Sequence, residues 1–244
     1  MREADREWID ANPVSRVKEH EIERDVPATV SVEKCIEVMQ FVQVFKGGRM
    51  VNYFAAQFFA GIRPDVRFGE IRRLMAAGSD RRVMNLETST IRVTKSISKT
   101  SDVRPVKIQP NLLKWFERYP LDKYPLVPKN AETLKAEIRA HFNLEHDVLR
   151  HTFISMYAQK FQTMGGAAMQ AGNSESIVKS HYYDTFTDAE AELFWSITPD
   201  SIAPDGEQLE KIKMAIAEID RCKAKGEKKI TAVGSLPPTV DGAI

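Results

Sequence analysis

The segment from residue 146 to residue 183 holds the side chains of this chain that are best suited to chemistry. Arg150 lies beside a stripe of apolar residues at helical spacing, namely Leu149, Phe153, Met156 and Tyr157. A guanidinium next to a protein core needs an anion, and a carboxylate of the same chain is the simplest one. The segment continues through a Gly-Asn-Ser break and ends on a histidine and two tyrosines. These later residues favour a functional role for Arg150 over a purely structural pairing with a carboxylate.

Several short motifs, in a fixed order, resemble the catalytic core of the tyrosine recombinases, also called phage-type integrases. The run LRHTF contains Arg150, GNS stands where many members carry Gly-His, and HYY follows. An upstream run, FFAGIRPDVRFGEIRRL, supplies Arg63 after a helix end of small residues, and ISKTSDVRPVKIQPNL supplies Lys99 between the two arginines. Tyr182 lies nine positions after Asn173, which is the family's spacing, so the resemblance implies Tyr182 as nucleophile and Tyr183 as its neighbour.

The resemblance implies DNA cleavage and rejoining through a covalent intermediate. Tyr182 would attack a scissile phosphate, form a 3′-phosphotyrosyl bond and release a 5′-hydroxyl. Arg63 and Arg150 would neutralise the nonbridging oxygens, which the forked guanidinium suits. Lys99 would be the general acid, with Lys95 as the fallback candidate. Because the covalent bond stores the energy for religation, the resemblance implies neither a metal nor a nucleotide cofactor.

Two positions depart from the family pattern. Asp147 stands where a histidine is common, three positions before Arg150, and His146 comes one step earlier. Asn173 replaces the histidine of the Gly-His pair. A carboxylate repels a phosphate unless it is protonated or paired, whereas asparagine can still donate a hydrogen bond. We expect both residues to line the site, either in a slow recombinase or in a family variant with a rearranged base.

Three histidines lie close enough in the sequence to approach this site, and all three are candidate substrate-binding residues. His146 could rotate into use beside Asp147. His151 directly follows Arg150, a position typical of a structural hydrogen-bonding residue, and His181 directly precedes Tyr182.

The elements that must position these residues form a mainly helical α+β domain. Apolar periodicity and end signals predict helices over 31–45, 51–61, 68–77, 110–119 and 131–142, with Ser31 as an N-cap and Gly61 as a terminator. Residues 188–197 are expected to be a packing element. Ile71 and Leu74 are expected to face inward. Arg63 therefore follows a helix end directly, before Pro64, a placement that restrains a guanidinium for phosphate clamping.

The period changes to two between Arg82 and Ile108, which predicts a small three-stranded antiparallel sheet. Residues 99–102 are the expected turn of its last hairpin, so the resemblance places Lys99 on a hairpin beside the site. Residues 62–110 carry eleven basic and five acidic side chains, and we expect a phosphate backbone to find a basic surface there.

Three regions are predicted along the chain. Residues 1–30 form a linker or arm, which in the family joins a DNA-arm-binding domain to the catalytic domain. Residues 31–200 form the tyrosine-recombinase catalytic domain. Residues 201–244 comprise an amphipathic helix and a disordered tail. In the family a carboxy-terminal element docks on a neighbouring protomer of a tetramer, and packing of this helix on its own domain is the simpler alternative.

The composition of the chain limits which classes of protein it can belong to. The chain has 244 residues, 43% of them hydrophobic, which is enough for a proper core. Its two cysteines show neither metal-ligand spacing nor a disulfide framework, and no signal peptide or membrane span is recognisable, which favours the cytoplasm. The formal net charge of +1 gives no argument for nucleic acid by itself.

Three functions remain open from the sequence. The first is a site-specific recombinase or integrase of a phage or other mobile element, acting on double-stranded DNA as a homo-oligomer, with a tetramer expected. The second is relaxation of DNA by a type IB topoisomerase-like enzyme. The third, motivated by Asp147 and Asn173, is a non-catalytic DNA-binding protein with the same fold.

Overall fold

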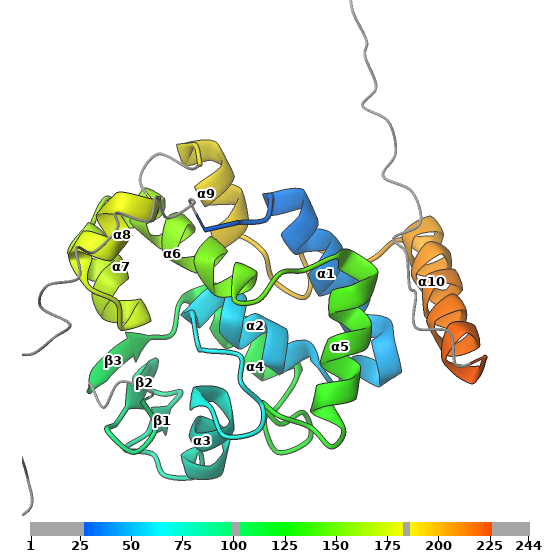
Figure 1. The fold of residues 1–244 in the computed structure, drawn as a ribbon, viewed down its shortest axis with the longest axis horizontal. Coiled ribbons are helices and arrows are strands. Elements are labelled where there is room, and N and C mark those ends of the chain that lie inside the picture. The colour runs from blue at the N-terminus through cyan, green and yellow to red at the C-terminus, as the bar shows by residue number, and fades with distance from the viewer. Residues whose placement is uncertain (1–26, 99–102, 183–185, 226–244) are drawn as a thin grey trace, which may run out of the picture.

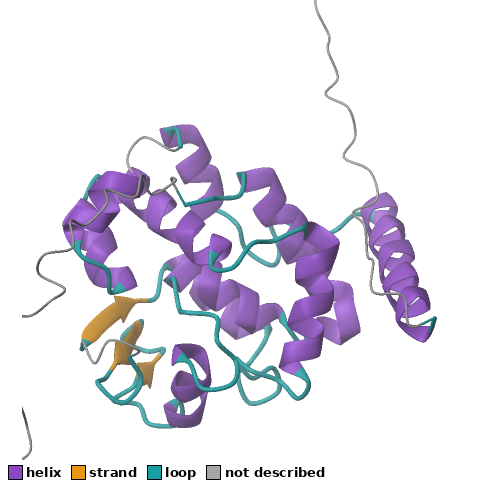
Figure 2. Cartoon of the chain, in the orientation of Figure 1, coloured by secondary structure: helices purple, strands orange, loops and turns teal. Residues whose placement is uncertain are grey.

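The computed structural model describes residues 27–98, 103–182 and 186–225, apart from the side chains of residues 180–182. Helices surround a central helix, and a small sheet lies at one edge (Figures 1 and 2). The helices are α1 (Val32–Val44), α2 (Val51–Ala60), α3 (Glu70–Ala77), α4 (Pro110–Arg118), α5 (Ala131–Phe142), α6 (Val148–Phe161), α7 (Met164–Ala171), α8 (Glu175–Tyr182), α9 (Asp188–Trp195) and α10 (Gly206–Ala224). A short 3-10 turn, η3 (Phe45–Gly48), follows α1. The predicted mainly helical α+β class is confirmed.

Helix α2 is the centre of the core. All ten of its residues are buried, because α1, α4 and α6 pack around it. The sequence predicted an apolar stripe on one side only, so the burial is more complete than expected. Gly61 ends α2 with φ of +61°, and a side chain there would collide with the Phe153 ring of α6. This close approach brings the end of α2 against α6.

The sheet consists of β1 (Met84–Asn85), β2 (Thr90–Val93) and β3 (Arg104–Lys107), antiparallel and in the order β1-β2-β3. This confirms the predicted sheet. Ile91 pairs with Val106 and Val93 pairs with Arg104, and all four side chains are buried. The strand period therefore turns Arg104 toward the protein interior, where β3 packs against α7. The expected hairpin turn at 99–102 lies outside the described residues.

Helix α3 begins later than predicted, at Glu70 in place of Phe68. The Asp65 carboxylate accepts hydrogen bonds from the amide groups of Arg67 and Phe68, at 2.9 and 3.3 Å, and turns the backbone before the helix starts. Ile71 and Leu74 face inward, as predicted.

Helix α10 packs against α1 of its own chain (Figure 1). Its residues Ile219 and Cys222 are buried, and Ile219 belongs to the main core. Ion pairs of 2.6 Å join Lys46 to Asp220 and Lys223 to Glu137. This is the simpler of the two expected arrangements, and exchange with a neighbouring protomer stays a prediction. No helix among the described residues is long and apolar enough to cross a membrane.

Candidate functional site

A buried carboxylate, Glu70, lies among three arginines where α3 begins. Its Oε2 atom is 3.2 Å from Nη1 of Arg63, and its Oε1 atom accepts a hydrogen bond of 2.6 Å from Nη2 of Arg104. Burial alone would raise the pKa of Glu70, but the Arg104 hydrogen bond and the charges of Arg104, Arg150 and Arg63 hold it below its usual range. The carboxylate is therefore ionised and links the arginines.

Arg150 projects from the first turn of α6 and is only 3% exposed. It donates to the carbonyl oxygens of Gly61 and Ala171, at the ends of α2 and α7, and to Oδ1 of Asn173 at 3.1 Å. Two helix C-termini thus direct their negative ends at this cation. Burial, together with the Arg63 charge, lowers the pKa of Arg150 to about 9, which leaves it protonated at neutral pH.

The described hydrogen bonds of Arg150 go to carbonyl oxygens and an amide, and none of them goes to a carboxylate. The simple pairing with a carboxylate, which a lone buried arginine suggests, is not its arrangement here.

Arg63 lies just beyond α2, as predicted, and its side chain is 17% exposed. Its Nη2 atom donates to the Gly172 carbonyl oxygen at 3.0 Å, next to the Asn173 amide that contacts Arg150. Arg63 and Arg150, far apart in the sequence, therefore meet at the Gly172-Asn173 turn between α7 and α8. Gly172 has φ of +69°, and an added Cβ there would lie 3.0 Å from Nη1 of Arg104.

Arg104 is the site residue that the sequence interpretation missed. It was counted in the basic surface of residues 62–110, but its side chain is buried, and that assignment is wrong. Its Nε atom donates to the Gln170 carbonyl oxygen at 3.0 Å, while Nη1 is buried without a hydrogen-bond partner among the described residues. The two-residue period of β3, which puts Arg104 on the same face as Val106, was the signal that could have found it.

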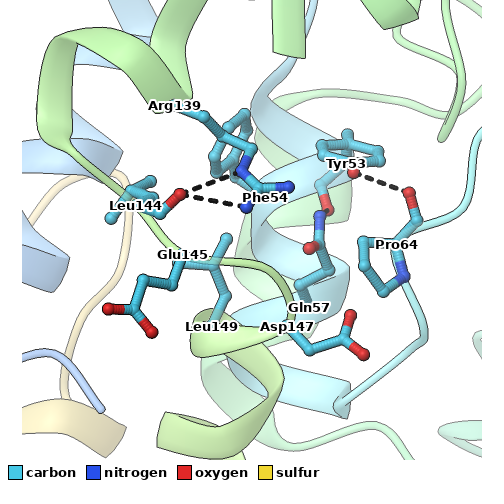
Figure 3. A pocket seen from close by; sticks show the side chains of 9 residues that line it. All are labelled: Tyr53, Phe54, Gln57, Pro64, Arg139, Leu144, Glu145, Asp147 and Leu149. Atoms are coloured by element: carbon cyan, nitrogen blue, oxygen red, sulfur yellow. Dashed lines mark hydrogen bonds between the residues drawn. The ribbon is translucent and has the colours of Figure 1, made fainter. Parts of the chain in front are cut away.

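Hydrogen bonds hold the loops that carry Pro64 and Asp147, as Figure 3 shows. The Tyr53 hydroxyl donates to the Pro64 carbonyl oxygen at 2.8 Å, and burial raises the pKa of Tyr53 far above its usual value, so it remains a donor. Arg139 donates twice to the Leu144 carbonyl oxygen, at 3.1 and 3.0 Å. These bonds restrain the backbone on either side of the site.

Asp147 is the N-cap residue of α6, with φ of +62°. Its Oδ1 atom is buried without a hydrogen-bond partner among the described residues, beside a cavity of about 10 Å³ that has room for roughly one water molecule. Its Oδ2 atom lies 3.4 Å from Nδ1 of His146, whose side chain is largely exposed. Asp147 and His146 line the same surface cleft as Arg63.

The other candidates divide into those that the structure places and those that it does not. Asn173 contacts Arg150 directly, and the partly exposed His151 lies one position further along α6. Tyr182 is the last residue of α8, which starts two residues after Asn173, and His181 precedes it. The side chains of these two, together with Lys99 and Tyr183, lie outside the described residues. Lys95 is exposed, between β2 and that gap.

Across the described ranges, no group of three or more His, Cys, Asp and Glu side chains is arranged to hold a metal ion. Comparison with protein families, curated proteins and solved structures gives no match, so the motifs and the site geometry carry the functional argument.

Proposed function

We propose that this chain is the catalytic domain of a tyrosine-type site-specific recombinase, which cleaves and rejoins double-stranded DNA through Tyr182. The observation that carries the proposal is the meeting of Arg63 and Arg150 at the Gly172-Asn173 turn, from which α8 leads directly to Tyr182. The sequence motifs require these residues to share one site, and the fold brings both arginines and the turn together.

The electrostatics of the cluster suit a phosphodiester. The three positive charges of Arg63, Arg104 and Arg150 outnumber the two nearby carboxylates, Glu70 and Asp147, so the site has an excess of positive charge in a region shielded from water. Charge accumulates on the nonbridging oxygens as a phosphate becomes pentacoordinate, and fixed cations stabilise that state without reorganising. Arg63, the most exposed of the three, is the one that a phosphate would reach first.

In the proposed reaction the Tyr182 hydroxyl releases its proton to solvent, and its oxygen forms a bond to phosphorus while the bond to the 5′ oxygen breaks. The leaving oxygen takes a proton from Lys99 and becomes a 5′-hydroxyl, and religation reverses these steps. Arg63 donates hydrogen bonds to the phosphate throughout, and the buried Arg104 and Arg150 stabilise the phosphate by their charge. Their carbonyl partners fix the guanidinium planes before DNA arrives, which lowers the entropic cost of binding.

The surface around the cluster supports DNA as the partner. Eight basic side chains of the 62–110 region are exposed: Arg67, Arg72, Arg73, Arg81, Arg82, Arg92, Lys95 and Lys107. They lie on α3, on the sheet and in the adjoining loops. Contacts of this kind give affinity for a phosphate backbone that falls with added salt.

Covalent trapping tests the proposal. Nicked suicide duplexes from the DNA that flanks the gene are mixed with wild-type protein and with Tyr182→Phe, Tyr183→Phe and Arg150→Ala variants, and adducts are separated on a denaturing gel. We expect an adduct with wild type and with Tyr183→Phe only. An adduct that persists in Tyr182→Phe would contradict the assignment of the nucleophile.

A non-catalytic DNA-binding protein with the same fold is the second candidate, and Asp147 is the observation that favours it. A carboxylate lining the cleft beside Arg63 opposes phosphate binding there. Retained binding of the same duplexes without any adduct would support this candidate. Relaxation of supercoiled plasmid without site preference would instead indicate a topoisomerase.

A further inference from the structure

A surface cleft of about 360 Å³ lies immediately beside the arginine cluster. The loop before α3 forms one wall, with Arg63, Asp65 and Phe68, and the loop before α6 forms another, with His146 and Asp147. A volume of this size is at the lower end of pockets that hold small organic ligands. Its position allows a ligand in the cleft to be joined covalently to a phosphate on Arg63.

Phe68 is the most exposed large apolar side chain among the described residues, at 78%. Its backbone is nevertheless well restrained, because Asp65 accepts hydrogen bonds from the amides of Arg67 and Phe68. Gly69 lies so close to Asp65 that an added Cβ would collide with the aspartate side chain. A rigid loop that presents an uncovered aromatic ring is suited to stack on a flat partner.

The acidic groups of the cleft decide what that partner is. Glu70 is occupied by Arg63 and Arg104, and Asp65 by backbone amides, which hold the pKa of Asp65 below its usual range. Asp147 is different, since its side chain is 28% exposed and, among the described residues, its Oδ2 atom has only the distant contact to His146. A free carboxylate oxygen repels phosphate but accepts hydrogen bonds from an amino group.

We propose that this cleft binds a nucleobase with an exocyclic amino group, taken from the DNA strand whose phosphate lies on Arg63. Phe68 stacks on the base, and Oδ2 of Asp147 accepts a hydrogen bond from its amino group, as carboxylates do from cytosine. The inference rests on the proposed function for the source of the base. It gives Asp147 a role in recognising the DNA next to the cleaved bond.

A base reaches such a cleft only when it is unstacked, so short single strands are suitable probes. We would measure the fluorescence anisotropy of labelled oligo(dC) and oligo(dT) of equal length at mildly alkaline pH. The strands share one backbone, and cytosine has an amino group where thymine has a carbonyl oxygen. We expect wild-type protein to bind oligo(dC) about tenfold more tightly, which is the effect of one hydrogen bond to a charged group.

Three variants separate the contributions of the two side chains. Asp147→Asn keeps the left-handed backbone conformation and can serve either base, so the preference for oligo(dC) should disappear. Phe68→Ala should lower the affinity for both oligo(dC) and oligo(dT) by about fivefold or more, because stacking does not depend on base identity. Met214→Ala removes another highly exposed apolar side chain, on α10, and should change the affinity for neither strand.

Equal affinity of wild type for the two strands would overturn the inference, as would a preference that survives Asp147→Asn or unchanged binding by Phe68→Ala. Competition by free dCMP as effective as that by oligo(dC) would make a mononucleotide the ligand and overturn the assignment to DNA. Tyr182→Phe should keep the base preference. A preference without any covalent adduct would therefore count against the proposed function and leave the cleft as a base-binding site.

Discussion

Replacement of Glu70 by glutamine tests whether one buried carboxylate holds the arginine cluster together. The side chain is inaccessible and makes ion pairs of 3.2 Å with Arg63 and 2.6 Å with Arg104. Removing one partner of a buried ion pair costs about 3–5 kcal/mol, because the other charge remains buried without compensation. We therefore expect Glu70→Gln to lower the free energy of unfolding at neutral pH by about that amount.

The stability difference between wild type and Glu70→Gln should change with pH in one direction only. Because the pKa of Glu70 is depressed in the folded state, its contribution to stability is present above the unfolded value of about 4.5 and is lost as the pH falls through the folded pKa. The stability difference between wild type and Glu70→Gln should shrink as the solution is acidified below pH 4.5. Urea denaturation of both proteins, followed by circular dichroism at several pH values, measures this difference in unfolding free energy.

Glu87→Gln is the matched control, since Glu87 makes a single ion pair of 3.3 Å with Arg81 on the surface. It should leave the urea midpoint unchanged. A Glu70→Gln protein as stable as wild type at neutral pH, or a stability difference that grows on acidification, would refute the reasoning.

Three further substitutions test other parts of the account. Arg150→Lys should still bind DNA but should form the adduct about a hundredfold more slowly, or slower still, because lysine cannot reproduce the forked set of donors. Single-turnover trapping measures the rate of adduct formation. Gly61→Ala should lower the thermal unfolding midpoint, because an added Cβ meets an aromatic ring of α6 at a positive φ, whereas Gly206→Ala, in open space, should not. Ile219→Ala should cost about 2–4 kcal/mol if α10 packs on its own domain; a loss no larger than that of Met214→Ala would contradict this packing.

Local signals in the sequence were sufficient to predict most of the helices and where they end. Ser31 accepts a hydrogen bond from the Lys34 amide as the expected N-cap of α1, and Gly61 ends α2 in the left-handed conformation. These features depend on a few neighbouring residues, so a single sequence reveals them. The placement of Arg63 directly after α2 follows from the same local information.

Features that depend on contacts between distant segments could not be predicted from the sequence. Arg104 was taken for a surface cation because charge alone suggested it, and only its partners Glu70 and Gln170 explain its burial. Phe68 was placed in a helix because the periodic pattern continues through it, while the turn at Asp65 prevents the helix from starting there. Both errors concern residues beside the candidate site, where local preference gives way to function and to contacts between distant segments.

Peptide mapping of the trapped adduct is the most direct test of the central claim. The wild-type protein is incubated with a suicide duplex, digested with protease and nuclease, and the peptide that retains a nucleotide is sequenced by tandem mass spectrometry. We expect the nucleotide to be attached through a phosphate to Tyr182. Attachment to Tyr183 or to any other residue, or efficient strand cleavage without any nucleotide-bearing peptide, would contradict it.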